Sequence, residues 1–245
     1  MAAVLMAGLL TGCADSGGPP SVGIRPSRST EAPGGPDSHR PSTDPAAGSR
    51  LERRIQRLLA GVAVVEEAGY HPGYDRSCGP GAGCVFGEEW TDDHPGRFGH
   101  NGCDTRQDVL LEQMRDVELR WGSTCRIFEA TLVDPYSGEL LTWQDDGYWI
   151  QIDHVYPLAQ AWHAGAWAWS RSRRLRFAND VDRELLAVSG RANQDKGAGG
   201  PGSWLPGNAA YRCRYVTKYL AVAAAYDLPV TRADALAIAA VARGC

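Results

Sequence analysis

Ile152-Asp153-His154-Val155-Tyr156-Pro157-Leu158 places a carboxylate and an imidazole side by side at the end of an apolar run of β-strand type. Pro157 then turns the chain towards a predicted helix. About forty residues later, Asn193-Gln194-Asp195-Lys196-Gly197 supplies an amide side chain on another predicted helix. The two segments together predict a functional site where this strand and this helix meet.

His154 is a candidate general base, because a neutral imidazole accepts a proton from water near neutral pH. Asp153 and Asn193 offer the hard oxygen ligands that suit Mg²⁺ or Mn²⁺. Each residue also has a structural interpretation: a structural histidine, an aspartate that caps the next helix, and an asparagine that bonds its own turn. Alternation along a strand would send Asp153 and His154 to opposite faces, so they share one cleft only if the strand ends here.

Positive charge near these segments is a candidate for binding phosphate. Lys196 follows Asn193 by one helical turn, and a solvated lysine is the alternative. The densest basic run lies between Trp169 and Phe177, where it can track a nucleic-acid backbone or form a solvated helix face. It consists of Arg171, Arg173, Arg174 and Arg176. The net charge of −4 predicts no global basic field, so any nucleic-acid affinity must come from such a local patch.

The N-terminal part predicts export. Residues Val4 to Leu10 are mostly apolar, and Leu10-Thr11-Gly12-Cys13 resembles a bacterial lipobox whose cysteine is lipidated after cleavage. The segment lacks the basic region typical of a signal peptide, so generic secretion and a chance match stay open. Residues 14–49 are rich in Gly, Pro, Ser and Thr and predict a disordered linker. We therefore expect residues 1–13 to be a signal segment with its lipobox, and residues 50–245 to form one folded domain.

Seven cysteines occur, and removing Cys13 for lipidation leaves six. An even number agrees with an oxidising compartment and with three disulfides. Six cysteines allow 15 pairings, of which we prefer the local one. It joins Cys78 to Cys84, Cys103 to Cys125 and Cys213 to Cys245. No Cys-x-x-Cys occurs, which disfavours a zinc site.

Hydrophobic periodicity predicts an α+β domain. Helices are expected over residues 51–65, 106–121, 158–169, 190–196, 209–226 and 232–242. Strands are expected over residues 126–132, 140–143, 148–152 and 185–188. Asp145-Asp146-Gly147 predicts a hairpin turn between the second and third of these strands. Residues 70–102, rich in Gly, Pro, Asp and Cys, predict a loop held by a disulfide.

The chain resembles the secreted actinobacterial HNH endonuclease family of the DUF1524 type, which is similar to the GmrSD C-terminal domain. The resemblance spans roughly residues 70–245. Beyond the two segments quoted above, it rests on Tyr74-Asp75-Arg76, Gly102-Cys103-Asp104-Thr105-Arg106, Asp134-Pro135-Tyr136-Ser137-Gly138, Ala161-Trp162, Phe177-Ala178-Asn179-Asp180, Trp204-Leu205-Pro206 and Tyr211-Arg212-Cys213-Arg214-Tyr215. It implies a ββα-metal (HNH/His-Me finger) core at about residues 148–200, inside a mainly helical, disulfide-stapled domain.

The resemblance implies roles for single residues. The family's metal aspartate, general-base histidine and helix asparagine correspond to Asp153, His154 and Asn193. Arg106 either touches phosphate or pairs with Asp104 to brace the site. Family members often carry an asparagine where this chain has Glu184, and that asparagine usually orients the loop with the base. Either Asn179 or Glu184 itself takes over this bracing role.

These observations predict a secreted or lipid-anchored, metal-dependent endonuclease that cleaves DNA, or RNA, with low sequence specificity. His154 would act as the base, Asp153 and Asn193 would hold Mg²⁺ or Mn²⁺, and Lys196, Arg106 and Arg174 would bind the substrate. The alternative is a non-catalytic cell-surface binding lipoprotein on a nuclease-like fold. A different secreted hydrolase is the third interpretation, although no Gly-x-Ser-x-Gly supports a serine enzyme.

Overall fold

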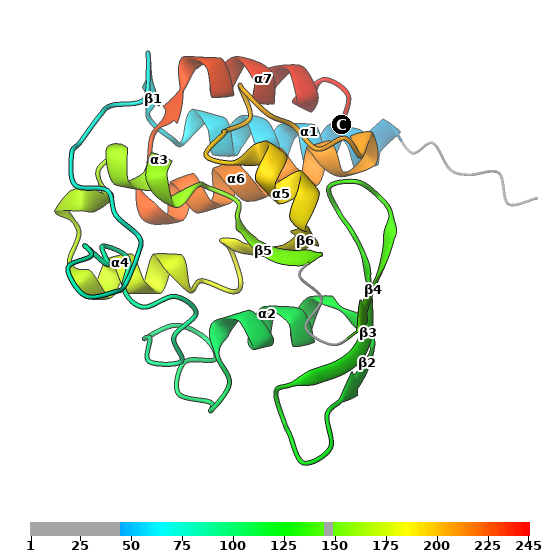
Figure 1. Ribbon diagram of the computed structural model, residues 1–245. Coiled ribbons are helices and arrows are strands. Elements are labelled where there is room, and N and C mark those ends of the chain that lie inside the picture. Colours follow the sequence, from blue (N-terminus) through cyan, green and yellow to red (C-terminus); the bar gives the residue numbers. More distant parts are fainter. Residues whose placement is uncertain (1–44, 145–148) are drawn as a thin grey trace, which may run out of the picture. The chain divides into compact units, whose positions relative to one another are not determined.

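The computed structural model describes residues 45–144 and 149–245. The expected signal segment, Cys13 and residues 14–44 of the expected linker lie outside these ranges. The described residues form a mixed unit of helices and small sheets (Figure 1). This unit has seven α-helices, three small sheets and three disulfides. The disulfides join Cys78 to Cys84, Cys103 to Cys125 and Cys213 to Cys245, which is the local pairing preferred from the sequence.

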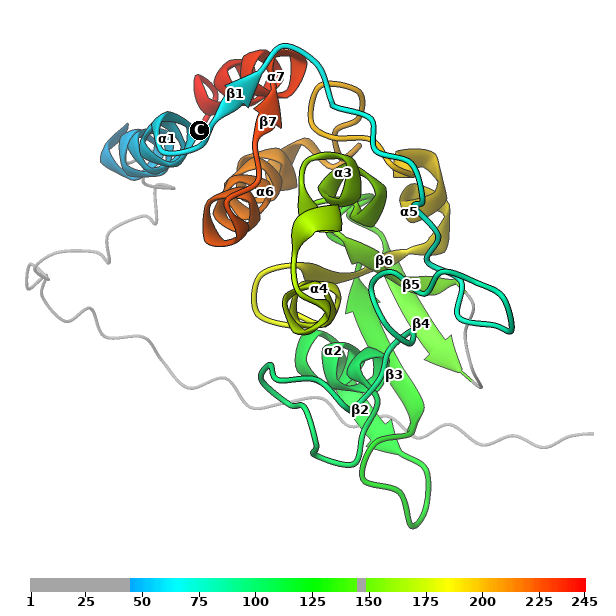
Figure 2. The same cartoon turned by 90° about the vertical axis from the view of Figure 1, so that its left-hand side faces the viewer.

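Three long helices pack together at one end of this unit (Figures 1 and 2). They are α1 (Pro45–Ala60), α6 (Arg212–Tyr226) and α7 (Arg232–Ala242). Their buried apolar faces include Ile55 of α1, Tyr219 of α6 and Ile238 of α7. The Thr231 hydroxyl and the Asp234 carboxylate form a capping box that starts α7.

The first helix ends earlier than its apolar pattern predicts. Helix α1 stops at Ala60, and Gly61 donates its N–H to the carbonyls of Arg57 and Leu58. The predicted extension to residue 65 is wrong, because β1 (Val64–Val65) is a strand that pairs in parallel with β7 (Val230–Thr231). β-branched valines favour this extended conformation once a glycine has ended the helix.

Helix α2 (Thr105–Gln113) is likewise shorter than the predicted helix over residues 106–121. The rest of that segment is strand β2 (Arg115–Leu119), which pairs with β3 (Ile127–Val133). Strand β3 also pairs with β4 (Leu140–Gln144), and all three strands are antiparallel. Apolar residues in β2 alternate with polar ones, and this two-residue period prevailed over the helical pattern.

The predicted hairpin between residues 140–143 and 148–152 does not form. Its turn lies outside the described residues, and the flanking strands belong to different sheets. Strand β5 (Ile150–His154) pairs instead with β6 (Leu185–Ser189), with Asp153 opposite Leu186 and His154 opposite Leu185. Helix α5 (Gly190–Lys196) begins directly after β6, where the Ser189 hydroxyl accepts the N–H of Ala192.

Residues between β5 and β6 form two short helices. Helix α3 (Leu158–His163) stops before the predicted end at residue 169, because Gly165 adopts a φ of +128° that ends the helix. A 3₁₀ turn (Ala166–Ala168) and α4 (Arg171–Ala178) follow, and a second 3₁₀ turn (Ala209–Tyr211) precedes α6. Helix α4 carries the basic run seen in the sequence.

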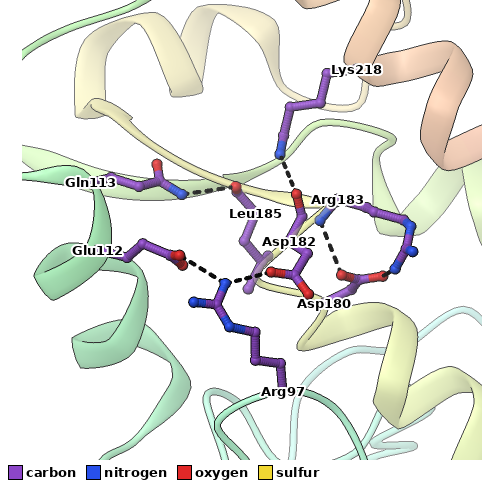
Figure 3. Close-up of polar contacts among 8 residues, drawn as sticks. All are labelled: Arg97, Glu112, Gln113, Asp180, Asp182, Arg183, Leu185 and Lys218. Atoms are coloured by element: carbon purple, nitrogen blue, oxygen red, sulfur yellow. Dashed lines mark hydrogen bonds and ion pairs between the residues drawn. The ribbon is translucent and has the colours of Figure 1, made fainter.

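The β5–β6 pair lies between two hydrophobic cores. Val155 and Val188 belong to the core shared with the long helices, whereas Ile152 and Ala187 belong to the core around α2 and the three-stranded sheet. Figure 3 shows part of the connection on the α2 side: the Gln113 amide donates to the carbonyl of Leu185 in β6. Packing on both sides fixes the position of β5 between the two cores.

A polar cluster strengthens the same connection (Figure 3). The Arg97 guanidinium reaches Glu112 of α2 at 2.7 Å and Asp182, just before β6, at 2.6 Å. These arginine contacts are partly exposed, so each contributes about 0–1 kcal/mol, and their main effect is to hold the loop around Arg97 in place.

Candidate active site

His154 lies at the end of β5 and is half-buried. Its Nε2 atom is 2.9 Å from the carbonyl oxygen of Ala178, at the end of α4. A carbonyl only accepts hydrogen bonds, so Nε2 carries the proton and Nδ1 keeps its lone pair. The Trp90 indole stacks on the imidazole with 5.6 Å between ring centroids. His154 is thereby held in the tautomer in which Nδ1 can accept a proton.

Burial lowers the pKa of the His154 imidazole to about 3, although the Ala178 carbonyl acts in the opposite direction. The ring is therefore neutral over the whole physiological pH range. A hollow of about 20 Å³ opens beside it, lined by Trp90, Arg76 and Asn179 among others. This volume accommodates about one water molecule.

Asp153 points to the other face of β5, as strand alternation requires. Its Oδ1 atom accepts a hydrogen bond from the Lys196 ammonium at 2.8 Å, and its Oδ2 atom accepts one from the Tyr136 hydroxyl. The Lys196 and Asp153 side chains are 0% and 5% exposed. Burial raises the pKa of the Asp153 carboxyl, and Lys196 and Tyr136 counteract that rise. Asp153 and Lys196 form a buried ion pair.

The Asp153 carboxylate, as arranged here, does not fit a bound divalent cation. Both of its oxygens are engaged, and the ammonium of Lys196 already supplies the neighbouring positive charge. Lys196 also donates to the main-chain carbonyl of His154 at 2.8 Å, so it is tied to the strand twice. In residues 45–144 and 149–245, no group of three or more His, Cys, Asp or Glu side chains is arranged to hold a metal.

Asn193 lines a wider cleft of about 590 Å³ that runs along Ile150 and Ile152 of β5. Its Nδ2 atom donates to the Gln151 side-chain oxygen at 2.9 Å. The cleft is also lined by Arg76, Glu89, Trp90, Arg106, Gln107 and Trp143. Sequence reasoning named Asn193 and Arg106, and the structure brings these two residues to one cleft.

Arg106 and Asp104 contribute to the same side of the cleft in different ways. The Arg106 guanidinium donates to the Ile150 carbonyl at 2.9 Å and lies 5.6 Å from the centroid of the Trp143 ring. Asp104 starts α2, because its carboxylate accepts the N–H of Gln107 at 2.8 Å. Asp104 thus fixes the helix that carries Arg106.

Two predicted substrate-binding residues, Lys196 and Arg174, make contacts within the fold. Lys196 is the buried partner of Asp153. Arg174 donates to the main-chain carbonyls of Val85 and Trp169, which ties the loop before α2 to the start of α4. The guanidinium of Arg174 therefore supports the wall of the site.

Glu184 braces the chain just after His154. Its carboxyl oxygens accept the N–H of Tyr156 at 3.2 and 3.3 Å, and the residue is 0% exposed. Burial raises the pKa of this carboxyl well above its ordinary value of 4.5, which favours the protonated form. Asn179 ends α4 by donating to the Leu175 carbonyl at 3.0 Å. Of the two residues considered for the bracing role, Glu184 bonds the turn that follows the base.

Glu184 should make the folded state less stable as the pH rises. Its pKa is raised in the fold, so its stabilising contribution is complete below pH 4.5 and is lost as the pH rises towards the folded-state pKa. The slope reaches about 1.4 kcal/mol per pH unit for one proton. Glu184→Gln keeps the acceptor for Tyr156 and cannot ionise, so its unfolding free energy should fall less between pH 5 and pH 8. Urea denaturation at both pH values checks this, and parallel pH dependences for the two proteins would refute the buried neutral acid.

Three residues of the site have no role in the sequence analysis. Trp90 covers His154 from a backbone with a φ of +55°, which no local pattern predicts. Tyr136 and Arg76 lie in segments that carry the family resemblance, but neither segment indicates what its side chain contacts. The Asp-Pro-Tyr-Ser-Gly turn was the available signal for Tyr136, since the Asp134 carboxylate accepts the N–H groups of Tyr136 and Ser137 and orients the ring.

Comparison with known proteins gives two matches. Residues 104–241 match the model of the family described as GmrSD restriction endonucleases, C-terminal domain. The chain is also 34% identical over 191 residues to a protein described as an uncharacterized secreted protein from Arthroderma benhamiae, covering 78% of this chain and 84% of that one. No solved structure matches.

Proposed function

Because the chain belongs to the family of GmrSD restriction endonuclease C-terminal domains, we propose that it is a nuclease that hydrolyses phosphodiester bonds, with DNA preferred over RNA. His154 is the proposed general base. The observation that carries this proposal is the neutral His154 imidazole, fixed through Nε2 by the Ala178 carbonyl, beside a hollow with room for about one water molecule. Within residues 45–144 and 149–245 we see no element suited to reading base edges, so the proposed specificity for sequence is low.

The proposed reaction starts with a water molecule next to His154. As the water oxygen attacks the phosphorus atom, the Nδ1 atom of His154 takes the proton that the water loses. The bond from phosphorus to the leaving oxygen breaks, and the leaving oxygen takes up a proton from a solvent water. The Ala178 carbonyl and the Trp90 ring hold the imidazole in one orientation. Glu184 holds the turn at Tyr156 that follows, so the base does not have to reorganise during the reaction.

A divalent cation, Mg²⁺ or Mn²⁺, remains part of the proposal, with Asp153 and Asn193 as its ligands. When bound, such an ion would neutralise charge on the phosphate and the leaving oxygen. Such an ion reaches the Asp153 carboxylate by displacing Lys196 from Oδ1 or Tyr136 from Oδ2. The cation requirement is therefore separate from the role of His154.

A non-catalytic binding protein on a nuclease-like fold is the second candidate. The observation in its favour is the same closed Asp153, whose two oxygens are occupied by Lys196 and Tyr136. The presence of the base, the hollow and the cleft favours the nuclease.

We further propose that the protein acts outside the cell. The three disulfides are typical of an oxidising compartment, and the Arthroderma benhamiae relative is described as secreted. None of the described helices is long and apolar enough to span a membrane. A lipid anchor at Cys13 lies outside the described residues and stays a proposal.

The test of the proposed function is nicking of supercoiled plasmid DNA by the oxidised full chain, with Mg²⁺, with Mn²⁺ and with EDTA. We expect nicking with a divalent ion and its loss in EDTA, and slower cleavage of RNA than of DNA. Cleavage that persists in EDTA would refute the cation requirement alone. A protein that cleaves neither polymer with either ion, but still binds them, would establish the non-catalytic alternative.

A further inference from the structure

The hollow beside His154 and the cleft beside Asn193 share a common wall. Three residues line both of them: Arg76, Glu89 and Trp90. All three come from the loop before α2, and in the cleft they line the same space as Ile150 and Ile152 of β5. When a nucleic-acid strand lies in the cleft and one of its phosphates is attacked next to His154, that phosphate must lie beside these three residues.

Arg76 is the cation of that wall. The residues that line the hollow beside His154 include one arginine, Arg76, which also lines the cleft. Its guanidinium lies 2.7 Å from the Glu89 carboxylate, and the two side chains are 49% and 60% exposed. An exposed ion pair of this kind is worth only about 0–1 kcal/mol, so phosphate can replace Glu89 at little cost.

The loop around Arg76 is rigid on both sides of the residue. The Asp75 carboxylate accepts the N–H groups of Ser77 and Gly83, and these bonds lower the pKa of that carboxyl. The main-chain N–H of Val85 bonds the Asp75 carbonyl, and the Cys78–Cys84 disulfide closes the loop. Arg76 is therefore presented from a fixed backbone, which lowers the entropy lost when its side chain binds an anion.

We propose that Arg76 binds the phosphodiester group that is cleaved, exchanging Glu89 for two phosphate oxygens. This inference rests on the proposed nuclease function and adds the residue that places the phosphate next to the base. A guanidinium presents paired N–H donors that match a phosphate. The other arginines near the site are engaged with main-chain oxygens: Arg106 with Ile150, and Arg174 with Val85 and Trp169.

The experiment measures binding separately from cleavage. A labelled DNA duplex is titrated with the full chain by fluorescence anisotropy at several salt concentrations, in EDTA and in a His154→Ala background that prevents turnover. Arg76→Gln should weaken binding by about ten- to a hundred-fold, the cost of losing a charge-assisted contact. It should also reduce the slope of log Kd against log salt by about one. Glu89→Gln should tighten binding by up to about five-fold, because Arg76 is then free.

Arg232→Gln is the matched control. Arg232, the first residue of α7, forms another exposed ion pair with Glu66 at 3.3 Å. The variant removes one arginine charge, as Arg76→Gln does, but at a position away from the site. If the wild-type chain cleaves DNA but Arg76→Gln binds the duplex as tightly as Arg232→Gln does, the assignment of Arg76 is overturned. The proposed function is then left intact. A wild-type chain that neither binds nor cleaves nucleic acid overturns both.

Discussion

His154→Ala is expected to lower the rate of phosphodiester cleavage by about a hundred- to ten-thousand-fold, the usual contribution of a positioned general base. The loss should fall on kcat, because the imidazole acts on water and not on the bound strand. Duplex affinity should stay within about two-fold of wild type, since removing a neutral ring deletes no phosphate contact. Plasmid nicking with saturating and limiting DNA separates the two parameters.

His100→Ala is a suitable control for this variant. The His100 side chain is 68% exposed and lies 3.7 Å from Asp93 on the surface. The His100→Ala variant should cleave DNA as fast as the wild-type protein. Equal activity of His154→Ala and wild type would remove the base from the proposed mechanism.

The low pKa of His154 also shapes the expected pH profile. Because burial lowers that pKa to about 3, the neutral, proton-accepting form persists far below the ordinary value of 6.5. We expect kcat/KM to show no acid limb near pH 6.5 and to stay level from pH 7 down to about pH 5. An acid limb centred near pH 6.5 would mean that the ring is solvated in the active protein.

Lys196→Met is expected to have the largest effect on stability, a loss of about 3–5 kcal/mol in the free energy of unfolding. The methionine fills similar volume but leaves the Asp153 carboxylate buried without its counter-charge. The main-chain carbonyl of His154 loses a donor as well. Urea denaturation of the oxidised protein at pH 7 measures the change.

Two further variants identify the cause of that loss. Lys218→Met removes the other lysine of the chain, whose ammonium is 3.4 Å from the Asp182 carbonyl, and should cost less. Adding Asp153→Asn to Lys196→Met should recover part of the stability, because an amide needs no counter-ion. If the double variant is no more stable than the single one, the lost energy comes from packing and not from an uncompensated charge.

The same variants test the proposed ligand Asp153 without measuring activity. A divalent ion that binds the folded state raises its stability. Mn²⁺ should therefore restore stability to Lys196→Met and not to the variant that also carries Asp153→Asn. Equal effects of Mn²⁺ on both would place the ion elsewhere.

Local patterns predicted the bounds of elements that begin or end at a turn or cap visible in the sequence. Helices α5 and α7 have the predicted bounds, and strands β3 and β6 lie within a residue of theirs, because each is bounded by a turn or cap that the sequence displays. The partner of β5 was not predictable in this way. Strand β6 lies about thirty residues further along the chain. The Asp145-Asp146-Gly147 sequence instead favoured a hairpin with the preceding strand, β4.

The sequence named part of the candidate site but did not predict how its residues are arranged. The adjacency of Asp153 and His154 gave both residues, and strand alternation already warned that they face opposite sides. The sequence does not show which neighbouring groups bind the Asp153 carboxylate in the fold. The sequence analysis expected Lys196 to bind phosphate, whereas the fold buries its ammonium against the Asp153 carboxylate. This contact depends on how α5 packs on β5. Trp90 and Arg76 come from an irregular loop, where no periodicity assigns a direction to a side chain.

The Cys78–Cys84 disulfide makes the surroundings of Arg76 depend on redox potential. It closes a loop with a sequence separation of only six residues, so it adds little to global stability and acts chiefly on local geometry. In a reducing cytosol this bond is open. For an exported protein, as proposed above, the loop that carries Arg76 therefore acquires this restraint only after it has left the cytosol.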